Sequence, residues 1–600
     1  MSEARLADPV TTLARMFLNT CRVYAKPALF LVKREGTYGP ISTAEAAAEV
    51  RELAAGFIEL GLRPGTKVVI LSENRPEWVM ADLAVLCAGG VTVPIYTSLL
   101  PEHIRHIVKD SDAEVVICSN RELWLKVEAV KADLPAVRHY VMIDEEEPAG
   151  TLTFGEIRGT GRRALDADPD LFERAALAVR PSDLASIIYT SGTTGAPKGV
   201  MLSHENFLSN IRSVDQVVDF LTSDVALSFL PLSHVFERTA TFLFLSHGST
   251  IAHAESIETV SENFVEVRPT VMVSVPRLFE KMYTRVMDMV LNLPAPKKAM
   301  FFWALAVGRR VTARQLARQR IPPALKLKRV LAHRVVFAPI LARTGGRVRF
   351  FICGGAPLAA DIIEFFWAMG LYILPGYGLT ETSPVLTGSD VAGVRFGTAG
   401  RAIPGVELRI AQDGEILARG PNIMVGYYKR ESETREALEG GWFHTGDIGY
   451  LDQDGYLVIT DRKKDLIVTA GGKNVAPQPI ESVLNLNPYI AGAVVVGERR
   501  RFISALIVPN FERLEAYARA NGIPFRDRAE LCRRDDIRSF MLAEVNRATP
   551  DLASYERVKK IALLDRDFDL ESGEVTPTFK VRRNIVEARY RDVIDALYED

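Results

Sequence analysis

Hydrophobic residues along the chain follow two patterns, one with the period of a helix and one of short continuous runs. Ser42 and Glu45 have the spacing of a helix capping box, and apolar residues then recur with helical period until Gly61, which predicts an amphipathic helix. Short apolar runs predict buried strands at 68–71, 91–96, 115–118, 270–275 and 348–353. This alternation predicts an α/β fold with several layers and largely buried sheets.

A domain boundary is predicted where a strand-like YLVIT segment meets the charged residues 461–465. Beyond it the signals are shorter, with strands predicted at 493–496 and 503–508. We therefore expect a large α/β N-terminal domain at 1–463 and a small α+β C-terminal domain at 464–600.

Composition narrows the class of protein. Of 600 residues, 48% are hydrophobic and 25% charged, which is typical of a folded globular enzyme. The net charge of −2 argues against a surface devoted to nucleic acid. The five scattered cysteines have no metal-ligand spacing, and neither a signal peptide nor a spanning apolar stretch is recognisable. We expect a cytoplasmic protein without a disulfide framework or a structural zinc site.

One stretch departs from this balance. Between Asp288 and Asp361 the chain has fourteen Lys or Arg residues and no acid, interleaved with apolar clusters. Such a segment is typical of a helix that lies on an anionic membrane surface. A solvated helical hairpin whose positive face meets acidic protein would have the same composition, so both interpretations stay open for residues 297–349.

The strongest chemical signal is YTSGTTGAPKG at 189–199, directly after an apolar run at 185–188. Its glycines and hydroxyl residues allow backbone N–H groups to approach phosphate oxygens, and Lys198 adds positive charge. Because Gly199 follows Lys198, the segment does not have the GxxxxGK[ST] pattern of P-loop NTPases.

At this point the sequence resembles the adenylate-forming superfamily, which joins acyl-CoA synthetases, peptide-synthetase adenylation domains and firefly-type luciferases. The resemblance covers nearly the whole chain. It continues in the order CGGAPL (353–358), GYGLTET (376–382), WFHTGD (442–447), DRKKD (461–465), GGKN (471–474) and PTFK (577–580).

The resemblance implies a set of nucleotide-binding residues. These are Thr190, Ser191, Gly192, Thr193, Thr194, Gly195, Lys198, Gly355, Ala356, Pro357, Gly376, Tyr377, Gly378, Thr380, Asp447, Arg462 and Lys580. Glu381 and Thr190 are the implied Mg²⁺ pair, which suits an ion that prefers oxygen ligands. Lys580, Lys198 and Glu381 are the implied catalytic residues, since a carboxylate that meets the α-phosphate of ATP needs positioning and counter-charge.

The C-terminal domain is implied to move between two half-reactions. In the resembling enzymes it rotates about a hinge that matches Lys464, so that Lys580 leaves and a loop corresponding to Gly471, Gly472 and Lys473 faces CoA. Lid motions of this kind also keep water from the adenylate.

Local features favour a long-chain fatty acid as the substrate. The segment LPLSHVFER at 230–238, GGKNVAPQPIE at 471–481 and the ending TPTFKVRR resemble long-chain acyl-CoA synthetases, with His234 as a wall of the acyl site. The predicted reaction converts ATP, fatty acid and CoA into acyl-CoA, AMP and diphosphate. Alternatives are a fatty acyl-AMP ligase that loads a carrier protein, a ligase for aromatic or very-long-chain acids, and a lipid-binding scaffold without turnover.

Overall fold

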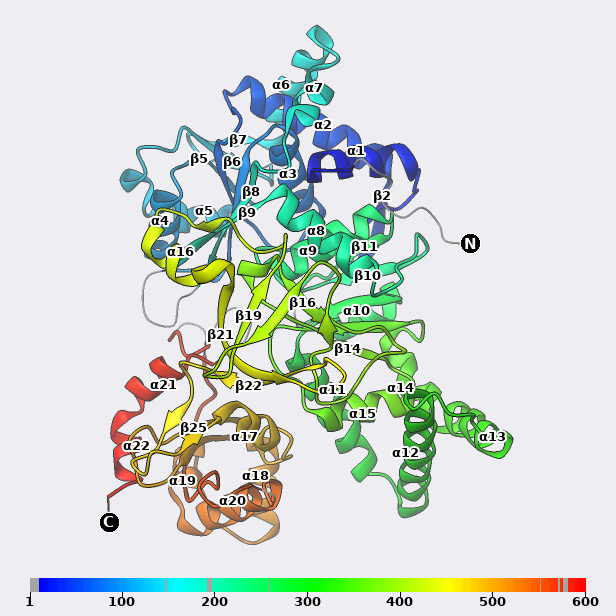
Figure 1. Ribbon diagram of the computed structural model, residues 1–600, viewed down its shortest axis with the longest axis vertical. Coiled ribbons are helices and arrows are strands. Elements are labelled where there is room, and N and C mark those ends of the chain that lie inside the picture. Colours follow the sequence, from blue (N-terminus) through cyan, green and yellow to red (C-terminus); the bar gives the residue numbers. More distant parts are fainter. Residues whose placement is uncertain are drawn as a thin grey trace.

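The computed structural model describes residues 10–145, 148–190, 197–256, 258–550, 552–569, 572–575 and 581–599. Figure 1 shows a large upper body, a smaller body at its lower left that holds the C-terminal helices, and a helical arm at the lower right. The predicted α/β class, with a large N-terminal and a small C-terminal domain, is confirmed.

An eight-stranded, mostly parallel sheet forms the upper part of the large domain. Its order is β20-β9-β8-β4-β3-β5-β6-β7. The bounds are β20 Gly426–Tyr427, β9 Lys198–Ser203, β8 Leu184–Thr190, β4 Val91–Ile95, β3 Lys67–Leu71, β5 Ala113–Cys118, β6 His139–Met142 and β7 Leu152–Thr153. The central strands are buried on both faces, as their continuous apolar runs predict.

A second sheet of seven strands has the order β14-β13-β12-β10-β11-β1-β2. The bounds are β14 Ile373–Pro375, β13 Phe350–Cys353, β12 Val271–Ser274, β10 Val225–Ser228, β11 Thr250–His253, β1 Phe30–Arg34 and β2 Thr37–Ile41. All five strands predicted in the N-terminal domain lie in these two sheets, within two residues of their expected ends.

Helices pack on the two sheets and fill the core. They are α1 Leu13–Val23, α2 Thr43–Glu59, α3 Pro76–Cys87, α4 Pro101–Asp110, α5 Arg121–Glu128, η1 Lys131–Asp133, α6 Phe154–Ala167, α7 Leu171–Ala178, α8 His204–Asp215, α9 Val235–Ser246, α10 Val260–Val267 and α15 Ala360–Met369. The capping box predicted at Ser42 and Glu45 begins α2. Helices α3 and α9 are buried almost all round, which marks them as core helices.

Two smaller sheets lie below and carry much of the candidate site. One contains β15 Tyr377–Gly378, β16 Val385–Gly388 and β17 Arg401–Ala402. The other contains β18 Glu407–Ile410, β19 Glu415–Arg419, β21 Phe443–Leu451 and β22 Leu457–Arg462. Helix η4 Thr380–Thr382 lies between β15 and β16, and α16 Glu431–Ala437 and η5 Glu439–Gly441 lie between β20 and β21.

The basic segment forms the helical arm. It contains the end of α11 (Pro276–Leu291), α12 Ala295–Leu316, α13 Pro323–Ala332, a π-helical turn η2 His333–Phe337, α14 Ala338–Leu341 and η3 Ala342–Thr344. Among the described residues, no helix has the length and apolar character needed to cross a bilayer.

The C-terminal domain has its own apolar core. Its elements are β23 Ile467–Val468, β24 Asn474–Val475, α17 Pro477–Leu484, β25 Ile490–Val496, β26 Ser504–Pro509, α18 Phe511–Ala520, α19 Arg528–Arg533, α20 Asp535–Ala548, β27 Lys560–Leu563, α21 Arg583–Arg589 and α22 Arg591–Ala596. Both predicted strands are present as β25 and β26. Polar contacts tie the domain to the larger one, including Arg277 Nη2 to the Ala491 carbonyl at 3.3 Å and an Arg513–Asp288 ion pair.

Candidate active site

The segment predicted to bind phosphate lies between two consecutive, paired strands. Strands β8 and β9 pair antiparallel with Thr190 opposite Lys198, so these two residues flank the segment. The segment itself, with Ser191, Gly192, Thr193, Thr194 and Gly195, lies outside the described residues. Its two ends are held by the sheet, which fixes where the loop begins and ends.

Lys198 is linked to Glu381 through a tyrosine that the sequence did not single out. The Lys198 ammonium lies 5.3 Å from the centre of the Tyr427 ring and 3.8 Å from a Glu433 carboxylate oxygen. The Tyr427 hydroxyl donates to Glu381 Oε1 at 3.0 Å. Because β20 pairs with β9, with Tyr427 opposite Val200, these groups converge on one edge of the eight-stranded sheet.

Glu381 is held in a desolvated position. It lies on η4, and its backbone carbonyl accepts from the Met424 N–H at 2.8 Å. Burial raises the pKa of the Glu381 carboxyl above its ordinary value. A cation beside this group would stabilise its ionised form. Thr380, at the start of the same helical turn, is partly buried.

Tyr377, Asp447 and Arg462 form a connected set. The Tyr377 hydroxyl donates to Asp447 Oδ2 at 2.7 Å, and Arg462 Nε lies 3.1 Å from Asp447 Oδ1. Asp447 and Arg462 face each other across β21 and β22. Burial and the neighbouring Asp447 raise the pKa of Tyr377 well above its ordinary value, so the hydroxyl stays a donor.

The charges of this set also reach Glu381. Arg462 favours the ionised form of the Glu381 carboxyl, whereas Asp447 opposes it. Burial would lower the pKa of Arg462, but Asp447, Asp465 and the other nearby acids outweigh it and hold that pKa above the usual value. The structure therefore brings Glu381, the predicted carboxylate ligand of Mg²⁺, together with the predicted ribose-binding residues Asp447 and Arg462 in one electrostatic cluster.

The two glycine-containing turns lie side by side. Strands β13 and β14 pair in parallel with Cys353 opposite Pro375, and the Gly376 N–H donates to the Cys353 carbonyl at 2.9 Å. Gly355 has φ +86°, a conformation that favours glycine, and Gly355, Ala356 and Pro357 are exposed. A Cβ on Gly378 would lie 1.8 Å from the Pro384 carbonyl oxygen, so no larger residue fits there.

His234 begins α9 beside these turns. Its Nδ1 accepts from the Phe236 N–H at 3.1 Å and caps the helix. A Cβ on Gly354 would lie 3.3 Å from the Phe236 ring, so the start of α9 packs directly on the turn at Gly354. Phe236 is thus a second candidate wall residue, and it lies within the LPLSHVFER segment that the sequence had already marked.

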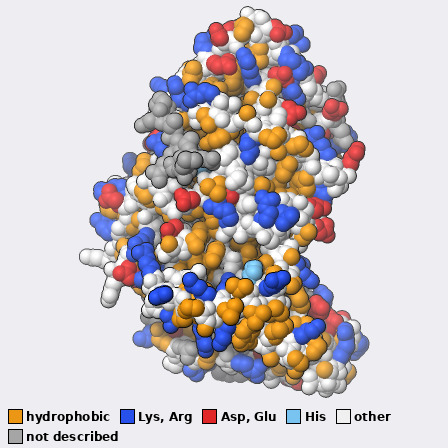
Figure 2. All heavy atoms as spheres, turned by 90° about the vertical axis from the view of Figure 1, so that its right-hand side faces the viewer, with side chains coloured by type: hydrophobic (Ala, Val, Ile, Leu, Met, Phe, Trp, Pro, Cys, Tyr) orange, Lys and Arg blue, Asp and Glu red, His pale blue; other side chains and the backbone are white. Residues whose placement is uncertain are grey.

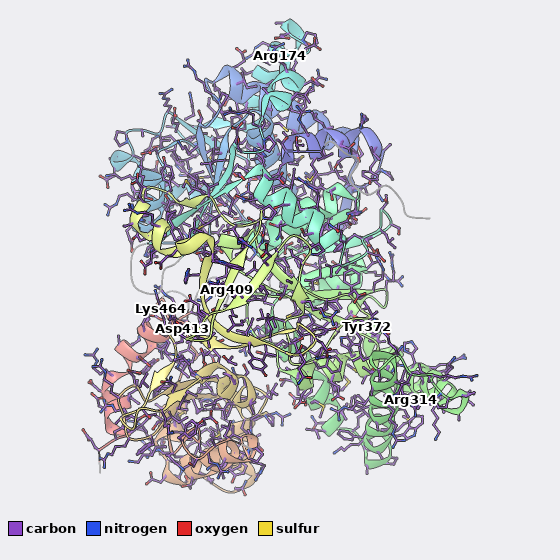
Figure 3. All side chains as sticks on the ribbon, viewed as in Figure 1. Arg174, Arg314, Tyr372, Arg409, Asp413 and Lys464 are labelled. Carbon is purple, nitrogen blue, oxygen red and sulfur yellow. The ribbon has the colours of Figure 1, made fainter. Side chains whose placement is uncertain are left out.

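The predicted hinge and CoA-facing residues lie in the C-terminal part of the chain. Lys464 is exposed and lies where the two bodies meet (Figure 3), next to Lys463, which pairs with Asp413 and Glu415. Gly471, Gly472 and Lys473 form an exposed hairpin turn, and Lys473 lies over Tyr555 of the same domain. Lys580 lies outside the described residues, although the flanking Val575 and Val581 pair as an antiparallel bridge.

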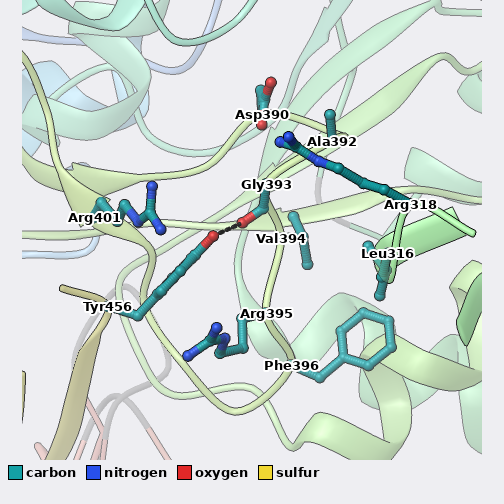
Figure 4. Close-up of a pocket in the computed structure, with 10 residues that line it drawn as sticks. All are labelled: Leu316, Arg318, Asp390, Ala392, Gly393, Val394, Arg395, Phe396, Arg401 and Tyr456. Atoms are coloured by element: carbon teal, nitrogen blue, oxygen red, sulfur yellow. Dashed lines mark hydrogen bonds between the residues drawn. The ribbon is translucent and has the colours of Figure 1, made fainter. Parts of the chain in front are cut away.

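A separate cavity of about 510 Å³ contains none of the predicted site residues. Figure 4 shows Tyr456 in its wall, with its hydroxyl donating to the Gly393 carbonyl at 2.7 Å. Arg395 and Arg401 stack on the Tyr456 ring, each at 4.4 Å. Arg395 is also paired with Asp452 and Asp454, so its charge is already compensated.

Comparison with known proteins places the chain in a family. Residues 20–428 match the AMP-binding enzyme family, and residues 464–600 match the AMP-binding enzyme C-terminal domain. The long-chain-fatty-acid–CoA ligase FadD15 of Mycobacterium tuberculosis is 36% identical over 94% of this chain and 93% of its own length. The peroxisomal long chain acyl-CoA synthetase 7 of Arabidopsis thaliana is 31% identical over 98% of this chain and 87% of its own.

Solved structures have the same fold. The anthranilate CoA ligase AuaEII in complex with anthranoyl-AMP has a TM-score of 0.74 at 19% identity and covers 98% of both chains. A Mycobacterium tuberculosis fatty acyl CoA synthetase has a TM-score of 0.60 at 22% identity, over 98% of this chain and all of its own. The predicted resemblance is confirmed, and the chain belongs to the AMP-binding enzyme family of adenylate-forming enzymes.

Proposed function

We propose that this protein is a long-chain fatty acid–CoA ligase that converts ATP, a fatty acid and CoA into acyl-CoA, AMP and diphosphate through an acyl-adenylate. Near-full-length relatives with this name support the assignment. The observation that carries it in the structure is the cluster in which Lys198, Tyr427 and Glu381 adjoin Tyr377, Asp447 and Arg462.

We assign the nucleotide to this cluster. The Tyr377 ring would lie against the adenine, with Gly355, Ala356 and Pro357 on its other side, because the exposed turn at 355–357 adjoins the partly buried segment at 376–378. The Asp447 carboxylate would accept from ribose hydroxyls. Arg462 would donate to ribose or phosphate oxygens. The hairpin from Thr190 to Lys198 would hold the phosphates, and Lys198 would exchange its weak contact with Glu433 for a phosphate oxygen.

The donor set suits Mg²⁺ shared with nucleotide phosphates. No described group of three or more His, Cys, Asp or Glu side chains could hold a metal alone. Glu381 is a single desolvated carboxylate, and Mg²⁺ in nucleotide sites takes one or two carboxylates and completes its shell with phosphate and water. When bound by Glu381 and Thr190, the ion would neutralise charge on the phosphates.

We further propose that the boundary at 463/464 is a hinge. The exposed Lys464 adjoins Lys463, which Asp413 and Glu415 anchor to the large domain. During adenylation, Lys580 would lie in the active site and neutralise charge. Rotation at the hinge would then move Lys580 out of the active site and bring in Gly471, Gly472 and Lys473, which would face CoA. Their exposed hairpin turn is free to move with the domain.

The acyl chain is assigned to the region beyond His234 and Phe236. Burying about fourteen methylenes at roughly 0.8 kcal/mol each would make about 11 kcal/mol available for selecting chain length. We also propose that the enzyme is cytoplasmic and makes peripheral contact with an anionic membrane through residues 297–349, where its substrate would partition.

The test is AMP and acyl-CoA formation by the purified protein with ATP, Mg²⁺, palmitate and CoA, with each component omitted in turn. Acyl-CoA that requires all four supports the proposal. Acid-dependent AMP without acyl-CoA would instead identify a ligase that loads a carrier protein, and no AMP with fatty acids of any length would overturn the substrate assignment.

A further inference from the structure

Helix α13 turns its apolar side chains toward solvent. Leu327, Val330 and Leu331 are 72%, 62% and 53% exposed, and Val335 in the following π-helical turn is 47% exposed. Residues spaced by three or four positions lie on one face of a helix. These four residues, here called the α13 stripe, therefore form one outward apolar band on a helix whose charged residues are all basic.

The opposite side of α13 packs against the rest of the molecule. Ala332 is fully buried, and the Arg329 guanidinium donates to the Ala368 carbonyl of α15. Figure 1 shows α13 projecting from the lower right of the molecule. Figure 2, which faces that side, shows hydrophobic side chains gathered low on the surface among Lys and Arg. The stripe is therefore a fixed feature of the packed helix.

The charges within the segment that carries the stripe have one sign. Lys326 and Lys328 lie on either side of Leu327, and no acid occurs between Asp288 and Asp361. A second copy docked on the same face would bring two basic surfaces together, which is unfavourable. The stripe is also one helix face only three turns long, whereas stable protein interfaces bury about 800 Å² per partner.

An anionic bilayer satisfies both features at once. Interfacial helices place an apolar face among acyl chains and basic residues beside the headgroups. Helix α12, which contacts η2, also exposes Phe302 and Trp303, and aromatic rings are favoured at this interface. We propose that the α13 stripe inserts into an anionic lipid surface; the proposal rests on the peripheral contact proposed above and names the residues that enter the lipid.

The test measures co-sedimentation of the full-length protein with two kinds of vesicle, anionic phosphatidylglycerol vesicles and neutral phosphatidylcholine vesicles. Wild type should bind the anionic vesicles, with weaker but residual binding at high salt, because insertion is not screened. Leu331→Glu should weaken binding about tenfold or more, since a buried leucine contributes about that factor. Leu125→Glu is the matched control, because Leu125 is 50% exposed on the distant α5, and it should bind like wild type.

Ligase activity on detergent-solubilised palmitate separates the two proposals. Every variant should keep it, whereas Leu331→Glu should lose turnover of palmitate supplied in anionic vesicles. Two outcomes would overturn the insertion and leave the ligase assignment unchanged. In the first, an active wild type binds neither kind of vesicle. In the second, it binds only at low salt, and Leu331→Glu binds equally well. Binding to an acidic protein instead of vesicles would also overturn it.

Discussion

Two aspartate–arginine pairs in this fold have the same chemistry but different surroundings. Asp82 and Arg238 join α3 to α9, and each side chain is only 1% exposed. Asp447 and Arg462 face each other at the candidate site, where the arginine side chain is 41% exposed and the aspartate 6%. The first pair lies in the core, whereas the arginine of the second pair is partly exposed to solvent.

The partners of the two arginines explain the difference. Arg238 donates to both Asp82 oxygens and to the hydroxyls of Ser186 and Thr92, so its donors are used within the protein. Asp447 is the only described carboxylate that forms an ion pair with Arg462. A saturated guanidinium stabilises the packing of its neighbours, whereas one with spare donors can bind a ligand.

The largest expected effect comes from breaking the core pair. Arg238→Met should lower the free energy of unfolding by about 3–5 kcal/mol, because it leaves Asp82 charged and unpaired in the core. Urea denaturation followed by circular dichroism measures this. Arg462→Met is the matched comparison and should cost less, because the Arg462 side chain is 41% exposed and Asp447 keeps its hydrogen bond from Tyr377. Equal losses would contradict the contrast between the two pairs.

The next effect tests the desolvated Glu381 carboxyl, which lies near the Asp447–Arg462 pair. Glu381→Gln should slow adenylation about a hundredfold and raise the Mg²⁺ concentration needed, because a carboxylate ligand contributes several kcal/mol of charge stabilisation. Pyrophosphate release at graded Mg²⁺ measures both. Glu439→Gln, an exposed acid on η5, should behave like wild type. An unchanged Mg²⁺ dependence of Glu381→Gln would remove Glu381 from the metal site.

Much of the architecture could be predicted from the sequence because its signals are local. Buried parallel strands are continuous apolar runs, and the capping box at Ser42 requires only neighbouring residues. The identities of Tyr377, Glu381, Asp447 and Arg462 followed from ordered motifs, but their mutual contacts depend on how β15, η4, β21 and β22 meet.

What could not be predicted depends on long-range pairing. Tyr427 reaches Lys198 and Glu381 only because β20 pairs with β9, far away along the chain. The composition of residues 297–349 revealed their charge but not the direction of the α13 stripe, since an apolar helix face ordinarily packs inward. Packing through Arg329 and Ala332 decides that orientation.

A smaller effect is expected from replacing Arg462, the partly exposed arginine of the second pair. Arg462→Met should lower kcat/KM for ATP in adenylation about tenfold or more, since a hydrogen bond from a charged donor contributes about 1.5–3 kcal/mol. Single-turnover formation of the adenylate measures this step without CoA. Arg409→Met, an exposed arginine on β18 that stacks on Trp442, is the control and should not change it. A loss that appears only when CoA is present would assign Arg462 to the second half-reaction.

The smallest effect separates the ring of Tyr377 from its hydroxyl. Tyr377→Phe keeps the surface that would lie against the adenine and loses only the hydrogen bond to Asp447, so KM for ATP should rise about twofold to tenfold. Tyr377→Ala removes the ring as well and should raise KM further. If both variants lost the same amount, the hydroxyl would be the essential group, and the main role of Tyr377 would be to orient Asp447. The Asp447–Arg462 pair would then depend on Tyr377 for its position, as the Asp82–Arg238 pair depends on Ser186 and Thr92.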